Sequence, residues 1–109
     1  MPYSRHRELL HEYNQCIDDR EYYGAHEKLE EIWYPRRHEN CSEMNLLKGF
    51  INAAVSFELV KRGRHTPSKR AWKNYLKYRP LLYKIHSPLL KEYHKTARKI
   101  EELRYHKKI

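Results

Sequence analysis

The fold is decided by residues 46–57, which read Leu-Leu-Lys-Gly-Phe-Ile-Asn-Ala-Ala-Val-Ser-Phe. Apolar side chains recur here at helical spacing, and Leu47 and Ile51 widen the apolar face beyond an ordinary amphipathic stripe. A helix that is apolar on two sides is buried between its neighbours. One flank carries polar or small side chains that let another helix approach closely, namely Asn45, Gly49, Asn52 and Ser56. The stretch therefore predicts a central helix.

Capping residues and prolines divide the rest of the chain into four further helices. Residues that favour a helix start stand at Ser4, Asp18, Ser42, Thr66-Pro67 and Ser87-Pro88. The first three helices are expected to end near Ile17, Tyr34 and Arg62, the third with Gly63 as its cap. Pro80 should kink or end the fourth. The sequence predicts an all-α fold: one compact bundle of about five helices around a buried third helix.

The composition limits the class of protein. The chain has 109 residues with three Gly and two Cys, which leaves room for one domain, residues 1–109, and excludes a disulfide scaffold. No targeting segment is visible, and the longest apolar stretch, residues 50–60, is broken by polar side chains. We therefore expect a cytoplasmic protein with no membrane span and both thiols reduced.

The charge is uneven along the chain. Residues 1–54 hold 7 Lys or Arg against 10 Asp or Glu, whereas residues 55–109 hold 16 against 4. An acidic half followed by a strongly basic half favours a molecule with one basic face. The sequence names no reaction, so whether the protein is an enzyme stays uncertain.

The segment 22–33 carries the one motif that suggests chemistry. At 100° per residue, Tyr22, Ala25, Leu29 and Trp33 define its predicted core face. His26 falls inside this apolar arc, and Glu30, four residues on, lies at its edge within reach of the imidazole. Burying such groups is costly unless they are paired or bound to a ligand.

Two interpretations of the pair stay open. In the first, His26 and Glu30 only satisfy each other by a hydrogen bond. In the second, they form half of a site for a divalent metal ion such as Zn, Mn, Fe or Ni. Further donors would then come from His11 or Glu12 of the first helix, or from Asn52 of the third.

The same helix resembles the signature of a prokaryotic family known as domain of unknown function 309. Its pattern, H-x-x-x-E-x-x-(W/Y), is matched by His26, Glu30 and Trp33. Residues 47–55 are similar to the family's G-hydrophobic-I-Q-x-A helix, with Asn52 in place of the usual Gln. The resemblance covers roughly residues 8–85. It implies a small helical bundle and a suggested metal site at His26 and Glu30, with Trp33 as its apolar wall, but no established activity.

Basic residues line one face of each of the last two expected helices. They are Lys69, Arg70, Lys73, Lys77 and Lys84 in one helix and Lys91, Lys95, Arg98 and Lys99 in the next. The candidate contacts among them are Lys69, Arg70, Lys73, Lys77, Lys91 and Lys95. Such repetition is typical of a surface that binds nucleic acid or another polyanion, although no known nucleic-acid-binding motif accompanies it. Solvated helix faces are also lysine-rich. A third interpretation docks the basic half on Glu27, Glu31 and Glu39, within the chain or across a homo-oligomer.

Overall fold

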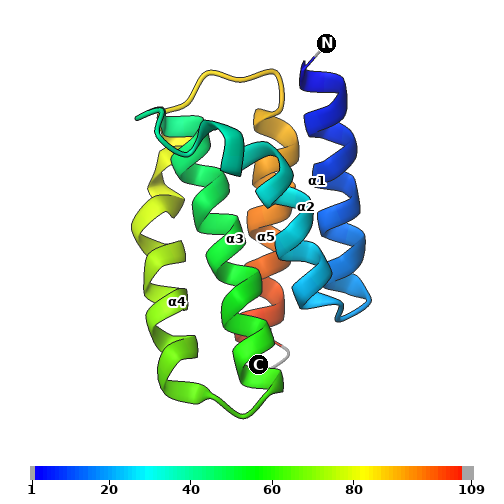
Figure 1. The fold of residues 1–109 in the computed structure, drawn as a ribbon, viewed down its shortest axis with the longest axis vertical. Helices are drawn as coiled ribbons and strands as arrows, with labels where there is room; N and C mark the ends of the chain where they lie inside the picture. The colour runs from blue at the N-terminus through cyan, green and yellow to red at the C-terminus, as the bar shows by residue number, and fades with distance from the viewer. Residues whose placement is uncertain (1, 107–109) are drawn as a thin grey trace.

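Helix α3 (Ser42–Lys61) runs through the middle of a bundle whose other helices cover it on several sides (Figure 1). The computed structural model describes residues 2–106. Around α3 lie α1 (Pro2–Asp18), α2 (Tyr22–Trp33), α4 (His65–Tyr78) and α5 (Leu90–His106), with two 3₁₀ turns, η1 (Tyr34–Arg36) and η2 (Arg79–Tyr83). The radius of gyration, 12.9 Å, is that of a compact chain of this length. The predicted all-α class, the five helices and the central third helix are confirmed.

The core is organised around the Phe50 ring of α3, which is fully buried. Its ring centroid lies 6.4 Å from that of Tyr13 in α1, 6.3 Å from Tyr75 in α4 and 6.0 Å from Tyr93 in α5. The Tyr13 hydroxyl also donates to the Phe50 carbonyl at 2.7 Å. This one ring of α3 therefore packs against side chains of three other helices, α1, α4 and α5.

The flank of small residues on α3 receives α4, as the sequence predicts. A Cβ added at Gly49 would lie 3.0 Å from the Cβ of Tyr78, so the glycine allows this close approach. Further along, Ser56 and Ser68 are buried and each donates to the other's carbonyl, at 2.9 and 2.8 Å. These bonds satisfy polar groups that would otherwise be left unpaired in the interface.

The chain reverses between α1 and α2 through Arg20, whose φ is +60°. The Arg20 N–H donates to the Ile17 carbonyl, and the Glu21 N–H donates to the Cys16 carbonyl. This pair of bonds is a Schellman motif, which satisfies the last carbonyls of a helix. The prediction that Asp18 begins the second helix is therefore wrong. Asp18 is the last residue of α1, and α2 begins four residues later.

The other helix ends follow the predicted signals with small shifts. α3 ends in the same motif with Gly63 at φ +74°, and α4 stops at Tyr78, two residues before Pro80. The predicted side-chain caps are less accurate: α3 and α4 begin after Cys41 and Arg64, neither of which caps through its side chain. No helix within residues 2–106 is long and apolar enough to cross a membrane.

Candidate functional site

Helix α2 holds His26 and Glu30 in contact at a partly exposed position. The His26 Nε2 atom lies 3.1 Å from the Glu30 Oε1 atom, and the two side chains are 19% and 40% exposed. The His26 Nδ1 atom lies 3.0 Å from the carbonyl oxygen of Tyr23. A ring that donates from Nδ1 to this carbonyl either donates a second proton from Nε2 to the carboxylate or, when neutral, presents the Nε2 lone pair to a metal ion.

The apolar face of α2 differs from the predicted one. Its buried residues are Tyr22, Ala25, Leu29 and Ile32. Trp33, predicted to be in the core, is only half-buried because the 3₁₀ turn η1 follows it directly, and its ring lies 6.0 Å from the Nζ atom of Lys48. His26 therefore lies at the edge of the apolar face and not inside it.

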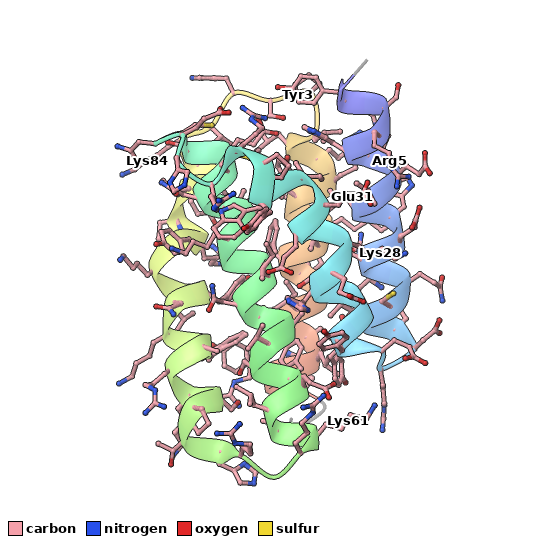
Figure 2. The ribbon with its side chains drawn as sticks, viewed as in Figure 1. Tyr3, Arg5, Lys28, Glu31, Lys61 and Lys84 are labelled. Atoms are coloured by element: carbon pink, nitrogen blue, oxygen red, sulfur yellow. The ribbon has the colours of Figure 1, made fainter. Side chains whose placement is uncertain are left out.

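Two of the three residues expected to complete a metal site, Glu12 and Asn52, have other partners. Glu12 of α1 forms an ion pair with Lys28 at 3.2 Å, and Lys28 lies on the side of α2 that faces α1 (Figure 2). The Asn52 carboxamide donates to the Lys48 carbonyl at 2.8 Å and accepts from Asn74 of α4 at 3.3 Å. Within residues 2–106, no three His, Cys, Asp or Glu side chains are grouped so that they could hold an ion. The described chain thus supplies two donors.

An apolar groove of about 180 Å³ opens beside His26, between α2 and α3. Its apolar and aromatic lining comes from Tyr22, Tyr23, Val55 and Leu59. The two charged residues of the lining, Glu58 and Arg62, form an ion pair at 2.6 Å. The apolar part of a small molecule could therefore lie in this groove, next to the His26 imidazole.

Two of the three carboxylates predicted to bind the basic half, Glu31 and Glu39, pair instead with cations of their own half of the chain. Glu31 pairs with Arg5 of α1 at 2.8 Å, and the two side chains meet between the helices in Figure 2. Glu39 pairs with Arg36 at 2.9 Å. The prediction that the basic half docks on these carboxylates within the chain is therefore wrong for both. The described ion pairs between the halves join α1 to α5, through Arg7–Glu92 and Asp18–Lys99.

The predicted basic faces are exposed. This holds for Lys69, Arg70, Lys73 and Lys77 on α4, and for Lys91 and Lys95 on α5. No carboxylate within residues 2–106 forms an ion pair with any of the six. Two tyrosines of the same half, Tyr83 and Tyr105, are 69% and 58% exposed. Cations and aromatic rings of the basic half are therefore both exposed to solvent.

The sequence did not predict two carboxylates, Glu43 and Glu101, each of which binds several side chains between the helices. Glu43 of α3 accepts from the Tyr93 hydroxyl at 2.5 Å and from Ser87 at 2.9 Å. Glu101 of α5 accepts from the Tyr75 hydroxyl at 2.6 Å and forms an ion pair with Arg79. Burial, and then the adjacent carboxylate, raise the pKa of Tyr75 and Tyr93 well above the ordinary value. The partners are far apart in sequence, so no spacing reveals them.

Comparison with known proteins gives one match. The model of a family described as Domain of unknown function (DUF309) matches residues 10–71, which is more than half of the chain. The match includes all of α2 and α3 and ends within α4, so α5 lies outside it. No curated protein and no solved structure matches the chain.

Proposed function

The chain belongs to the DUF309 family, and we propose that its helix α2 binds a divalent metal ion through His26 and Glu30. The observation that carries the proposal is the orientation of the His26 ring. Metal-binding histidines almost always donate their second ring N–H to a carbonyl or carboxylate, which fixes the other nitrogen toward the ion. The contact between Nδ1 and the Tyr23 carbonyl fits this role.

The distance between the two donors also suits a shared ion. Metal–nitrogen and metal–oxygen bonds of about 2.0–2.2 Å place neighbouring ligands about 3 Å apart. The Nε2–Oε1 distance of 3.1 Å lies in this range. An imidazole with one carboxylate suits Zn, Mn, Fe or Ni. A bound ion with open positions would supply Lewis acidity to a water molecule or to a polar group held near the groove.

Two donors from one chain leave the rest of the coordination shell to water or to a second copy. Both side chains are partly exposed, so water or a second copy of the chain can reach the site. Two copies would together supply four donors, and we propose a metal-dependent homo-oligomer on this basis. Sedimentation of the protein with and without Ni or Zn tests it: the apparent mass should rise only with the ion. The cytoplasm, where Cys16 and Cys41 would stay reduced, is the compartment in which we expect this activity.

The metal proposal is tested by titrating the metal-free protein with Zn, Mn, Fe and Ni while recording binding heat and melting temperature. At least one ion should bind and raise the melting temperature, because a ligand of the folded state stabilises it. His26→Ala and Glu30→Ala should each remove both effects. Glu27→Ala is the matched control, since this exposed acid follows His26 on the same helix. If no ion changes the wild-type melting curve, the pair is only an ion pair and the proposal fails.

A second candidate function is the binding of single-stranded nucleic acid by the basic half. Two observations favour it. Six exposed cations of α4 and α5 have no carboxylate partner among the described residues. Tyr83 and Tyr105 are exposed, and bases can stack on such rings. Successive lysines four residues apart on α4 are separated by about 6 Å along the helix axis, a spacing that can follow a phosphate backbone.

The nucleic-acid proposal predicts a steep loss of affinity with salt, because each neutralised phosphate releases counterions. Replacing Lys69, Lys73 and Lys77 with Glu should abolish binding of an arbitrary oligonucleotide. Tyr83→Ala should weaken binding of a single strand more than that of a duplex. Equal retention of the wild type and the triple variant on a phosphate matrix would rule this function out.

A further inference from the structure

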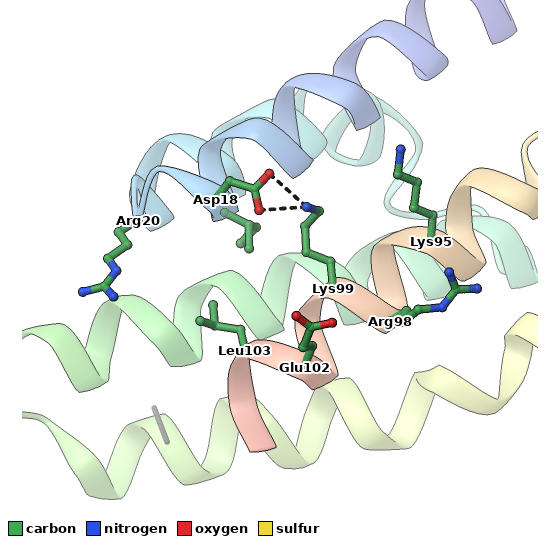
Figure 3. Close-up of a pocket in the computed structure, with 8 residues that line it drawn as sticks. Asp18, Arg20, Lys95, Arg98, Lys99, Glu102 and Leu103 are labelled. Atoms are coloured by element: carbon green, nitrogen blue, oxygen red, sulfur yellow. Dashed lines mark hydrogen bonds and ion pairs between the residues drawn. The ribbon is translucent and has the colours of Figure 1, made fainter. Parts of the chain in front are cut away.

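A pocket of about 440 Å³ lies between the C-terminal end of α1 and helix α5, away from the site on α2 (Figure 3). Its charged lining consists of Asp18, Arg20, Lys95, Arg98, Lys99 and Glu102. Four of these residues are cations and two are carboxylates, so the pocket carries a net positive charge. Its volume is in the range of sites that hold small molecules.

The charges of the pocket are arranged along its length. In the middle, the Lys99 Nζ atom donates to both oxygens of Asp18, at 2.7 and 2.9 Å, so these two residues neutralise each other. Figure 3 shows Arg20 at one end and Lys95 and Arg98 at the other. The pocket therefore offers positive charge at two ends. Between the ends lie the neutral Asp18–Lys99 pair, the Glu102 carboxylate and the apolar side chains of Ile17 and Leu103.

The walls of the pocket are held in place by polar contacts between α1 and α5. The buried Thr96 hydroxyl donates to Asn14 at 2.9 Å, one turn before the Lys99–Asp18 contact. Lys95 and Leu103 are eight residues apart on α5, which corresponds to about 12 Å of helix axis. A ligand that spans the pocket must therefore be elongated.

The backbone of Arg20 gives a separate reason to assign a role to its side chain. Arg20 takes the left-handed position of a Schellman motif, which Gly63 takes at the end of α3. Glycine adopts this conformation without strain, whereas a residue with a Cβ does so at a cost. The chain keeps a long cation at the strained position, beside the pocket.

We propose that this pocket binds a small elongated dianion, with one carboxylate or phosphate group at each end and an apolar middle. Arg20 would hold one anionic end, and Lys95 with Arg98 the other. Ile17 and Leu103 would contact the middle of the molecule. This site is independent of the metal proposal, because it shares no residue with α2. It shares Lys95, Arg98 and Lys99 with the predicted basic face of the last helix, and none with that of α4.

The test uses isothermal titration of the full chain with two series of increasing length, α,ω-alkane dicarboxylates and α,ω-alkane bisphosphonates. Alkyl carboxylates and alkyl phosphonates, which carry one anionic group, are the reference compounds. A dianion of fitting length should bind about tenfold or more tighter than the monoanion of the same type. The series that binds tighter identifies the anionic group.

The variants separate a built site from general attraction by a basic protein. Arg20→Gly and Lys95→Ala should each reduce the affinity for the dianion to that for the monoanion, and Glu102→Gln should raise it. Lys73→Ala removes one exposed cation outside the pocket and should change nothing. Because Arg20→Gly relieves backbone strain, it should fold at least as well as the wild type.

Two results would overturn the proposal. One is a wild type that binds no dianion better than the corresponding monoanion. The other is a Lys73→Ala variant that weakens binding as much as Arg20→Gly does. Failure of the metal proposal would leave this test unaffected, since none of its variants touches His26 or Glu30.

Discussion

At the scale of the residue, the exposure of His26 and Glu30 decides what their contact contributes to stability. A partly exposed pair four residues apart on a helix contributes about 0.3–0.5 kcal/mol. Alanine has a higher helix propensity than histidine by about 0.6 kcal/mol. The two effects nearly cancel, so we predict that His26→Ala changes the free energy of unfolding of the metal-free protein by less than about 1 kcal/mol.

Urea denaturation in the presence of a chelator measures this change. Glu27→Ala, which removes an exposed carboxylate from the same helix, is the control. A loss of about 2 kcal/mol or more for His26→Ala would contradict the prediction. It would show instead that the imidazole is mainly a structural element of the bundle.

Arg20 gives the second prediction at this scale. Its left-handed backbone costs about 1 kcal/mol relative to glycine, and the pocket offers no carboxylate within the described residues that forms an ion pair with it. We therefore expect Arg20→Gly to raise the free energy of unfolding by about 0.5–1 kcal/mol. Arg20→Ala keeps the strained backbone while removing the charge, so it should give no such increase. A destabilised Arg20→Gly protein would mean that the side chain makes a stabilising contact.

At the scale of the element, the two helical glycines should respond in opposite ways to the same substitution. At Gly24 of α2 an added Cβ would meet the Cys16 Sγ atom at 3.7 Å, an ordinary contact. At Gly49 of α3 it would meet the Cβ of Tyr78 at 3.0 Å, with the Tyr75 carbonyl oxygen at 3.7 Å. Alanine gains about 0.8–1.0 kcal/mol of helix propensity at either position.

Gly24→Ala should therefore stabilise the protein by about 0.5–1 kcal/mol. Gly49→Ala should destabilise it by about 1 kcal/mol, because a Cβ is fixed to the backbone and can yield only if α4 moves as a whole. Thermal denaturation of the two variants, followed by circular dichroism, compares them directly. Equal shifts in the same direction would show that α3 and α4 are not packed as closely as the structure describes.

Some helix positions and helix ends could be predicted from the sequence and others could not, because they depend on different physical effects. The central position of α3 was predictable because residues 46–57 are apolar on two sides, and the small flank was predictable because it needs only Gly49 and Ser56. The end of α4 followed from Pro80. The turn between α1 and α2 was missed because an arginine took the place where a glycine is expected.

For the candidate site, the sequence predicted the contacts within helix α2 but not how α2 packs against the rest of the bundle. His26 and Glu30 meet because both lie on one helix, and their spacing is visible in the sequence. The position of the pair at the edge of the core was not predictable, because the rotation of α2 about its axis depends on Ile32 packing where Trp33 was expected. The pocket between α1 and α5 joins residues about 80 positions apart, for which the sequence holds no pattern.

At the scale of the whole molecule, buried tyrosines of the last two helices connect α3, α4 and α5. The Tyr93 hydroxyl of α5 binds Glu43 of α3, and the Tyr75 hydroxyl of α4 binds Glu101 of α5. The DUF309 match ends at residue 71, but Tyr75 and Tyr93 both pack on Phe50 in the centre of α3. The core of the matched region therefore includes side chains from outside it, in the second half of α4 and in α5.

These buried tyrosines predict a loss of stability at alkaline pH. Burial raises the pKa of Tyr13, Tyr75 and Tyr93 far above the ordinary value of 10. Above pH 10 the unfolded chain releases three phenol protons that the folded chain retains. The free energy of unfolding should then fall by about 1.4 kcal/mol per pH unit for each tyrosine, whereas below pH 10 these groups leave it unchanged.

Urea denaturation between pH 8 and about 12 measures the slope. Tyr93→Phe removes one of the three protons, so the slope above pH 10 should fall by about a third, although the lost bond to Glu43 lowers stability at neutral pH. Tyr83→Phe is the control, because this ring is 69% exposed and lies outside the core around Phe50. A wild type that keeps its neutral-pH stability above pH 11 would show that the three phenols reach water in the folded protein, and that the core around Phe50 is more open than the structure describes.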